Sequence, residues 1–350
     1  MGMFLLLSLL SGILEIGVVL YGFAAGMPAW AVLAMAAMYQ FGNLVCVPGK
    51  IRPFWIGGLG IFNLCLSIAN LFWKQPVVMA VLAALSSFGI QTARAGQKAA
   101  CPTWLKRLFR IGGFLLAPLM TVCPALVMVF CAGLPLAALL CGYKTGAFIG
   151  KTGKIGNENA GKALSAVMVF HQMHYFVYTY GMLLYLLGLT GNPKLCVVWF
   201  AWTWVVYLLP GWIAERRKRY RPRILFFVCH TFLAVLMVIL TESVRTAQIR
   251  TGFWAWMLTG LGGGSVFCIR RLTKREETCN MTLSENIGHF TGTLVSVGVS
   301  FAAGGTAMPV LTALSGIFVG MALVTAAFGI AGEERRKREN GRYGQGRMPS

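Results

Sequence analysis

Long apolar runs separated by short polar gaps occupy this chain from its first residues to about residue 331. A helix needs about 20 apolar residues to cross the hydrocarbon core of a bilayer. Runs of about that length lie at roughly 4–22, 28–47, 54–73, 76–93, 164–188, 195–214, 224–243, 252–269, 287–305 and 308–331. The pattern therefore predicts an all-α, polytopic membrane protein.

The stretch 111–142 is too long for one crossing and barely long enough for two. Pro118, Pro124 and Pro135 interrupt it, and proline breaks or kinks a helix. The stretch either crosses twice, with a tight turn near Gly133 or earlier, or dips into the membrane and returns as a re-entrant hairpin. Two crossings would bring the total to about twelve helices, six before and six after a Gly- and Lys-rich segment.

The 31 Lys and Arg residues gather in alternate gaps, for example from Arg94 to Arg110, and only Lys74, Lys194, Arg245 and Arg250 lie in the others. Positive residues in short loops stay on the cytoplasmic side. We therefore predict a multi-pass protein of the cytoplasmic (inner or plasma) membrane with both termini in the cytoplasm. This topology accounts for the net charge of +21 together with attraction to anionic lipids, so we expect no nucleic-acid partner.

These observations predict four parts of the chain. Residues 1–142 form an N-terminal six-helix half, 143–162 a cytoplasmic connector, 163–332 a C-terminal six-helix half and 333–350 a basic cytoplasmic tail.

Two loops at corresponding positions of these halves share a motif. The first, GNLVCVPGKIR, contributes Gly42, Gly49, Lys50 and Arg52, and the second, GWIAERRKRYR, contributes Gly211, Glu215, Arg219 and Arg221. Both loops resemble the signature loop of the major facilitator superfamily, although Cys46 stands where the first loop should carry an acid and Lys218 replaces the second glycine of the other. The resemblance implies two six-helix repeats that alternate in access about a midplane site, with these eight residues as conformational-switch loops.

Ionisable side chains inside a membrane are costly and are functional candidates by default. Glu15 lies near the middle of the first predicted helix, and His171, His174 and Tyr178 lie on one face of the seventh. The resemblance implies that the first, fourth, seventh and tenth helices line a central cavity. We therefore predict a site for substrate and proton coupling made of Glu15, Gln91, His171, His174, Tyr178 and Trp256. The competing interpretation is that the histidines hydrogen-bond neighbouring helices and the tyrosines pack.

Two classes of function fit this sequence. The first is a proton-coupled secondary active transporter of a small organic solute, without a resident cofactor or metal. The alternative is an intramembrane metal- or haem-dependent enzyme, or a non-transporting assembly factor that keeps the fold. His171 and His174, joined by His230, have the spacing for a metal, whereas the ten cysteines form no C-x-x-C pair. Solute uptake favours the first class, and bound metal or haem favours the enzyme.

Overall fold

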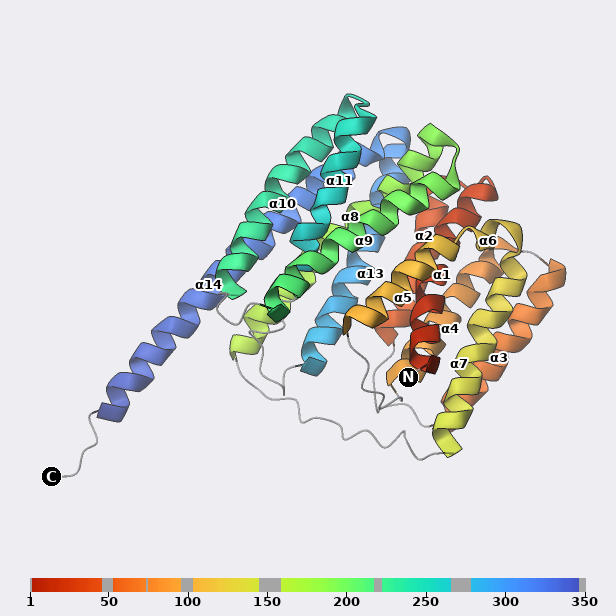
Figure 1. Ribbon diagram of the computed structural model, residues 1–350, viewed down its shortest axis with the longest axis horizontal. Helices are drawn as coiled ribbons and strands as arrows, with labels where there is room; N and C mark the ends of the chain where they lie inside the picture. Colours follow the sequence, from red (N-terminus) through yellow and green to blue (C-terminus); the bar gives the residue numbers. More distant parts are fainter. Residues whose placement is uncertain are drawn as a thin grey trace.

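The computed structural model describes residues 2–45, 53–73, 75–95, 103–144, 159–216, 222–265 and 278–345. Within these ranges the chain is helical and contains no strand. The helices are α1 (Gly2–Ala24), α2 (Ala29–Val45), α3 (Pro53–Trp73), α4 (Pro76–Ala95), α5 (Thr103–Leu116), α6 (Leu119–Val122), α7 (Pro124–Lys144), α8 (Asn159–Thr190), α9 (Pro193–Arg216), α10 (Pro222–Arg245), α11 (Ile249–Gly264), α13 (Thr278–Ala303), the 3₁₀ turn η2 (Gly304–Thr306) and α14 (Ala307–Gln345) (Figure 1).

The polar gaps of the sequence set the helix ends. Helices α3, α4, α7, α9 and α10 each begin with a proline, which suits the first helical position because the N–H that proline lacks has no partner there. Gly26 and Gly191 have φ angles of +68° and +60° in the turns after α1 and α8. Glycine adopts this left-handed conformation without a steric penalty, so the chain can reverse within a few residues.

The described helices have the length and composition of membrane-spanning segments. Six stretches are long and apolar enough to cross a bilayer, and one of them, Met281–Gly329, covers α13, η2 and most of the apolar part of α14. Ala29–Val45 and Ile56–Phe72 are shorter apolar helices. Large apolar side chains such as Phe72 and Val122 are about 80% exposed on the outer surface, where lipid can solvate them. The prediction of an all-α, multi-pass membrane protein is confirmed.

The stretch around 111–142 runs along the bundle through α5 and α6 and returns through α7 (Figure 1). The chain turns between residues 117 and 123, ahead of Gly133, and Pro135 lies inside α7 rather than at a break. The helix α5 also begins earlier than the apolar run. Lys106, Arg107 and Arg110, which the sequence places in a polar gap, therefore form the first turns of α5.

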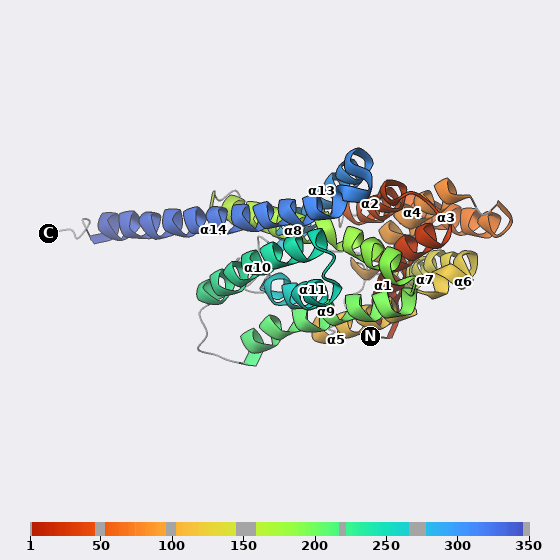
Figure 2. The same cartoon turned by 90° about the horizontal axis from the view of Figure 1, so that it is seen from above.

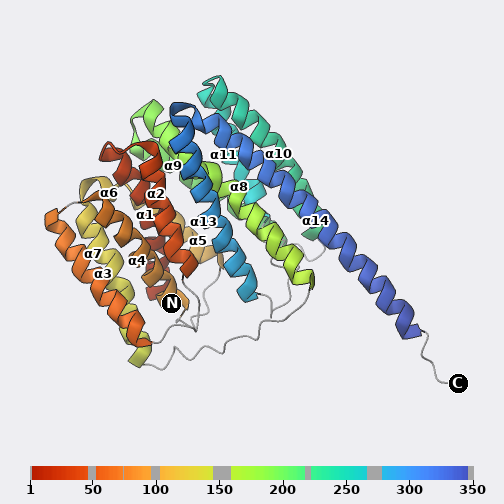
Figure 3. The ribbon, with the colours of Figure 1, turned by 180° about the vertical axis from the view of Figure 1, so that it is seen from behind.

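The helices form two neighbouring groups, which we name the N-terminal group (α1–α7) and the C-terminal group (α8–α14). Two pairs of helices carry most of the contact between them: α2 packs against α13, and α5 packs against α9 (Figures 2 and 3). Within the C-terminal group, α8 packs on both α13 and α14. The last part of α14 runs on beyond the bundle (Figure 3).

Candidate functional site

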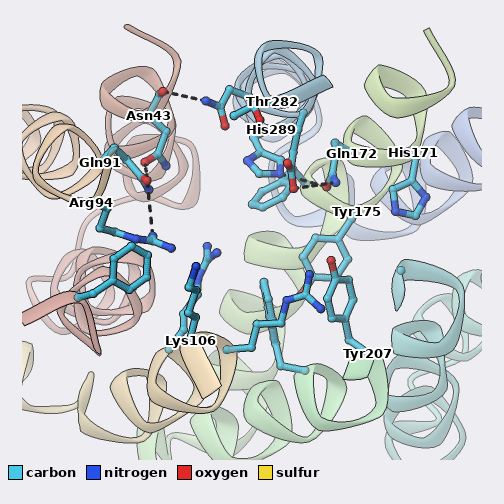
Figure 4. A pocket seen from close by; sticks show the side chains of 18 residues that line it. Asn43, Gln91, Arg94, Lys106, His171, Gln172, Tyr175, Tyr207, Thr282 and His289 are labelled. Carbon is cyan, nitrogen blue, oxygen red and sulfur yellow. Dashed lines mark hydrogen bonds between the residues drawn. The ribbon is translucent and has the colours of Figure 1, made fainter. Parts of the chain in front are cut away.

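A cavity of about 360 Å³ lies between the two groups of helices. One wall, from α4 and α5, is basic and carries Arg94, Lys106, Arg107 and Arg110. The facing wall, from α8 and α13, is polar and carries Gln172, Thr282, Glu285, Asn286 and His289. Figure 4 shows Arg94 and Lys106 reaching toward the same space as Gln172 and His289. This volume is in the range of pockets for small molecules.

Aromatic rings hold the basic side chains of the cavity in place. The Nζ atom of Lys106 lies 4.4 Å from the centroid of the Phe4 ring, and the guanidinium of Arg110 lies 4.8 Å from a ring centroid of Trp204. Arg107 lies 5.3 Å from the centroid of the Tyr207 ring. A cation over the face of an aromatic ring is stabilised by the ring quadrupole. The positive charges are thus directed into the cavity by side chains rather than dispersed at its rim.

An ion pair between Glu15 and Arg110 closes the inner side of the basic wall. The Nε atom of Arg110 donates to Oε2 of Glu15 at 3.0 Å, and Nη2 contacts the same oxygen. Tyr180 of α8 donates its hydroxyl to Oε1 of Glu15 at 3.3 Å. The Glu15 side chain is completely buried, whereas the Arg110 side chain is 22% exposed. Arg110 therefore connects the cavity to a carboxylate that is not itself part of the lining.

Two glycines bring α1 and α5 close enough for this pair to form. Gly12 lies one turn before Glu15, and Gly113 lies one turn after Arg110. A Cβ added at Gly113 would lie 2.1 Å from the carbonyl oxygen of Leu9, and one added at Gly12 would lie 2.1 Å from that of Arg110. The two backbones are therefore in direct contact, as in small-residue interfaces between membrane helices.

We expect Gly113→Ala to destabilise the protein, because the new methyl group meets backbone that cannot rotate away. Overpacking of this kind costs about 1–3 kcal/mol. The matched control is Gly112→Ala, whose Cβ would meet only Cδ1 of Leu9 at 3.8 Å, so it should be neutral or slightly stabilising. Apparent melting temperatures of the purified variants test the comparison. Equal melting temperatures would show that α1 and α5 are not held in contact.

A chain of buried polar side chains continues from Tyr180 to the outer part of the cavity. Gln40 donates to the Tyr180 hydroxyl at 2.6 Å, and Asn43 donates to Gln40 at 3.0 Å. Asn43 Oδ1 accepts from Ser87 at 2.8 Å and from Gln91 at 2.9 Å. Asn286 of α13 donates to the Asn43 carbonyl oxygen at 2.9 Å. The network thus joins the two groups of helices across the cavity.

The predicted histidines lie in two different environments. His171 lines the cavity, and its Nδ1 is 2.8 Å from Nε2 of His230, whose own Nδ1 is 2.9 Å from the Ser265 hydroxyl. His174 lies in the α8–α14 interface, where Ser315 donates to its carbonyl oxygen at 2.8 Å, and its Nε2 is buried without a partner. The structure thus brings His171 to the cavity, and it places His174 among packed helices.

The other predicted site residues are also placed by the structure. Gln91 lines the cavity and accepts from Arg94 at 3.5 Å. Tyr178 is buried and donates to Thr259 of α11 at 2.9 Å. Trp256 is fully buried and packs edge-on against Phe200, with ring centroids 6.1 Å apart. Neither Tyr178 nor Trp256 is among the residues that line the cavity.

The two motif loops are only partly described. Gly42 packs against α4, and an added Cβ would lie 2.2 Å from the Ala84 carbonyl oxygen. Gly211 is buried in α9, and Glu215 lies near the end of α9, although its side chain is outside the described part. The remaining predicted loop residues, Gly49, Lys50, Arg52, Arg219 and Arg221, lie outside the described residues.

Most of the residues that line the cavity are not among the predicted site residues. The charge pattern places Arg110 in a cytoplasmic gap, yet Arg110 lines the cavity, and so does His289. Tyr180 and Gln40 contact each other and lead to Glu15. A signal for Arg110 did exist, since a buried acid in a membrane needs a basic partner. Among the residues that the structure describes, no three His, Cys, Asp or Glu side chains are grouped to hold a metal ion.

Two helix groups around a polar cavity, joined through α2–α13 and α5–α9, define a polytopic membrane protein with the fold of the major facilitator superfamily. A bacterial homologue of the iron transporter ferroportin, crystallised in the outward-facing state with soaked iron, has a TM-score of 0.59 at 14% identity, with 94% of this chain and 98% of that chain covered.

Two other solved structures are similar. The nucleoside transporter NupG has a TM-score of 0.59 at 11% identity, covering 94% of this chain and 98% of that chain. A bacterial homologue of the human lysosomal transporter Spinster, inward-facing and occupied, has a TM-score of 0.61 at 11% identity, covering 94% and 96%. No family model and no curated protein matches the sequence. At these identities the likeness extends to the fold alone.

Proposed function

We propose that the protein is a secondary active transporter that moves a small organic solute through the cavity between the two helix groups. The observation that carries this proposal is the 360 Å³ polar cavity bounded by helices of both groups, with a buried ion pair at its inner side. A site at the boundary between two repeats is where rocking of one repeat against the other changes access. The fold, shared with transporters of several solutes, supports the same conclusion.

In this proposal residues 1–142 and 163–332 are the two halves, each crossing the membrane six times, with the connector 143–162 between them and the basic tail 333–350 after them. The cavity contains Arg94 and Lys106, from a gap that the charge distribution assigns to the cytoplasm. We therefore assign the described conformation to the inward-facing state of a protein in the cytoplasmic membrane. The basic connector and tail would then meet anionic lipid headgroups.

The proposed coupling group is Glu15. It is fully buried, it pairs with a basic residue of the cavity lining, and it accepts from Tyr180 on a helix of the other group. A change of its protonation therefore alters contacts both to the cavity and across the boundary between the groups. His171, which lines the cavity, is the proposed hydrogen-bond partner of the solute. His174 and Tyr178 hold α8 against α14 and α11, and Trp256 of α11 packs against Phe200 of α9.

Counterflow in proteoliposomes tests the transport proposal. Vesicles containing purified protein are loaded with each member of a broad metabolite panel at high concentration, and entry of the same labelled compound is measured. We expect transient accumulation of at least one small organic solute, and loss of it in vesicles without protein. Failure of every panel member to exchange, together with stoichiometric metal or haem in the purified protein, would favour the enzyme alternative.

Labelling of single cysteines on a cysteine-free background tests the proposed topology. We expect cysteines at Thr152 and Gly344 to react with an impermeant thiol reagent only after the membrane is opened, because both lie in segments rich in basic residues. A cysteine at Lys194, in a gap poor in basic residues, should react from outside in intact cells. Reaction of the Thr152 or Gly344 position from outside would contradict the assignment.

A further inference from the structure

The charge of the cavity lining is unbalanced in favour of cations. Arg94, Lys106, Arg107 and Arg110 are the basic lining residues, and Glu285 is the lining acid. Glu15 adds a second carboxylate behind Arg110. Among the residues that the structure describes, four basic side chains and one acidic side chain therefore line the cavity, and Glu15 pairs with one of the four bases from behind. A cleft whose lining is mostly of one sign of charge attracts small solutes of the opposite sign.

The positive-inside rule accounts for basic residues at the ends of membrane helices, but it does not explain why their side chains line a cavity. Lys106, Arg107 and Arg110 lie on α5, and all three line one cavity rather than the outer surface. The rings of Phe4, Tyr207 and Trp204 hold them there. Guanidinium and ammonium groups that line one cavity from neighbouring turns of a helix can bind the oxygens of a carboxylate or phosphate.

Arg110 occupies a special place in this set, because it is both part of the cavity and the partner of Glu15. Its 22% exposure leaves the guanidinium reachable from the cavity, whereas Glu15 is fully buried. A solute anion that takes over the guanidinium leaves Glu15 with the Tyr180 hydroxyl as its remaining hydrogen bond. A buried carboxylate without its counter-charge is strongly disfavoured, and binding a proton removes the charge.

We infer that the solute of the proposed transporter is a small organic anion, carboxylate or phosphate ester, that replaces Glu15 as the partner of Arg110 while Glu15 takes up one proton. This inference rests on the proposed transport function and names its substrate class and coupling step. The balance at Arg110 is simple: one anionic group of the solute takes the place of the Glu15 carboxylate beside the guanidinium, one proton neutralises the released carboxylate, and the guanidinium stays protonated throughout.

The groups that surround Glu15 show which side chain can bind this proton. Arg110 from α5 and Tyr180 from α8 contact it, and Tyr39 from α2 and Tyr175 from α8 lie close enough to interact electrostatically. In the other helices packed on α1, α4 contributes Arg94, α6 has no ionisable residue, and α7 has two cysteines, Tyr143 and Lys144. Glu15 is the acid among these groups, so the proton is assigned to it.

The first experiment compares solutes that differ in charge. The apparent melting temperature of the purified protein is measured with succinate against succinamide, glucose 6-phosphate against glucose, inorganic phosphate alone, and putrescine as a cation. We expect an anionic member to raise the melting temperature while its neutral partner does not. The succinate and phosphate arms distinguish the two sources of the anion.

Lys106→Gln is the matched test of the lining, and Lys194→Gln, at the start of α9 and outside the lining, is its control. Lys106→Gln should raise at least tenfold the anion concentration that gives half of the melting-temperature shift. Lys194→Gln should leave that concentration unchanged. A shift caused only by neutral or cationic members, no shift with any anion, or equal anion binding by both variants would overturn the inference. Counterflow of a neutral solute would then leave the transport proposal standing, whereas absence of all counterflow would contradict both.

Proton uptake tests the exchange at Arg110 directly. The anion that binds is added to purified protein in weakly buffered solution containing a pH-sensitive dye. We expect close to one proton taken up per anion bound by the wild-type protein, and none by Glu15→Gln, whose amide cannot accept it. Equal uptake by both proteins, or no uptake by the wild type, would show that Glu15 is not released.

Discussion

Arg110→Met is expected to lower the stability of the purified protein by about 3 kcal/mol, because it removes the counter-charge of a carboxylate that has no access to solvent. Tyr180 remains as a donor to Glu15, but one hydroxyl does not replace a guanidinium. The change should appear as a clear drop in apparent melting temperature in detergent.

The control for this variant is Arg245→Met. Arg245 forms the same kind of ion pair with Glu242, but both side chains are more than half exposed at the end of α10. Water screens and replaces that interaction, so we expect little change. The double variant Arg110→Met with Glu15→Gln should regain most of the lost stability, since no buried charge remains. Equal melting temperatures for Arg110→Met and Arg245→Met would show that the Glu15 pair is not buried in the native protein.

Glu15→Gln is expected to abolish accumulation driven by a pH gradient while solute exchange at equal concentrations continues. The amide keeps the size of the side chain, and its single oxygen can still accept from Arg110, while its NH2 group can donate to the Tyr180 hydroxyl. What it loses is the ability to bind and release a proton. Labelled solute uptake into proteoliposomes, with and without an imposed pH gradient, separates the two activities.

Glu242→Gln provides the matched control for that experiment, because Glu242 is an exposed acid of the same chain that does not line the cavity. It should behave like the wild-type protein in both assays. Undiminished uphill accumulation by Glu15→Gln would show that the residue is structural. The uptake data would then place the coupling group elsewhere, and His171, Glu285 and His289 are the other acid and imidazole side chains of the described lining.

The pattern of apolar runs predicts the helices well, because membrane crossing imposes a length and a composition on each of them. Its main error concerns α5, which begins at Thr103 although the apolar run starts near residue 111. The first turns of α5 carry Lys106, Arg107 and Arg110, whose charge excludes them from a hydropathy window. They are helical nonetheless, because they line a polar cavity rather than face lipid.

The candidate site could be predicted only in part. Glu15 stands out in the sequence because a carboxylate within a membrane-spanning apolar run is energetically costly and is therefore a functional candidate. Its partners could not be found in the same way. Arg110 lies 95 residues away and Tyr180 lies 165 residues away, so their proximity follows from the packing of α1 against α5 and α8. Helical spacing correctly groups His171 and His174 near each other, but it does not distinguish the cavity from the α14 interface.

The measurement that tests the central proposal most directly is the two-sided accessibility of a cavity residue. Tyr175 lines the cavity close to Glu15, and Tyr175→Cys on a cysteine-free background places one thiol there. Cysteines at Lys194 and Thr152 serve as outside and inside controls in oriented vesicles. If the protein alternates its access, we expect the thiol at residue 175 to react with a small impermeant reagent added to either side. Each control thiol should react from one side only. Reaction of the thiol at 175 from a single side, under every condition of pH and solute, would contradict alternating access.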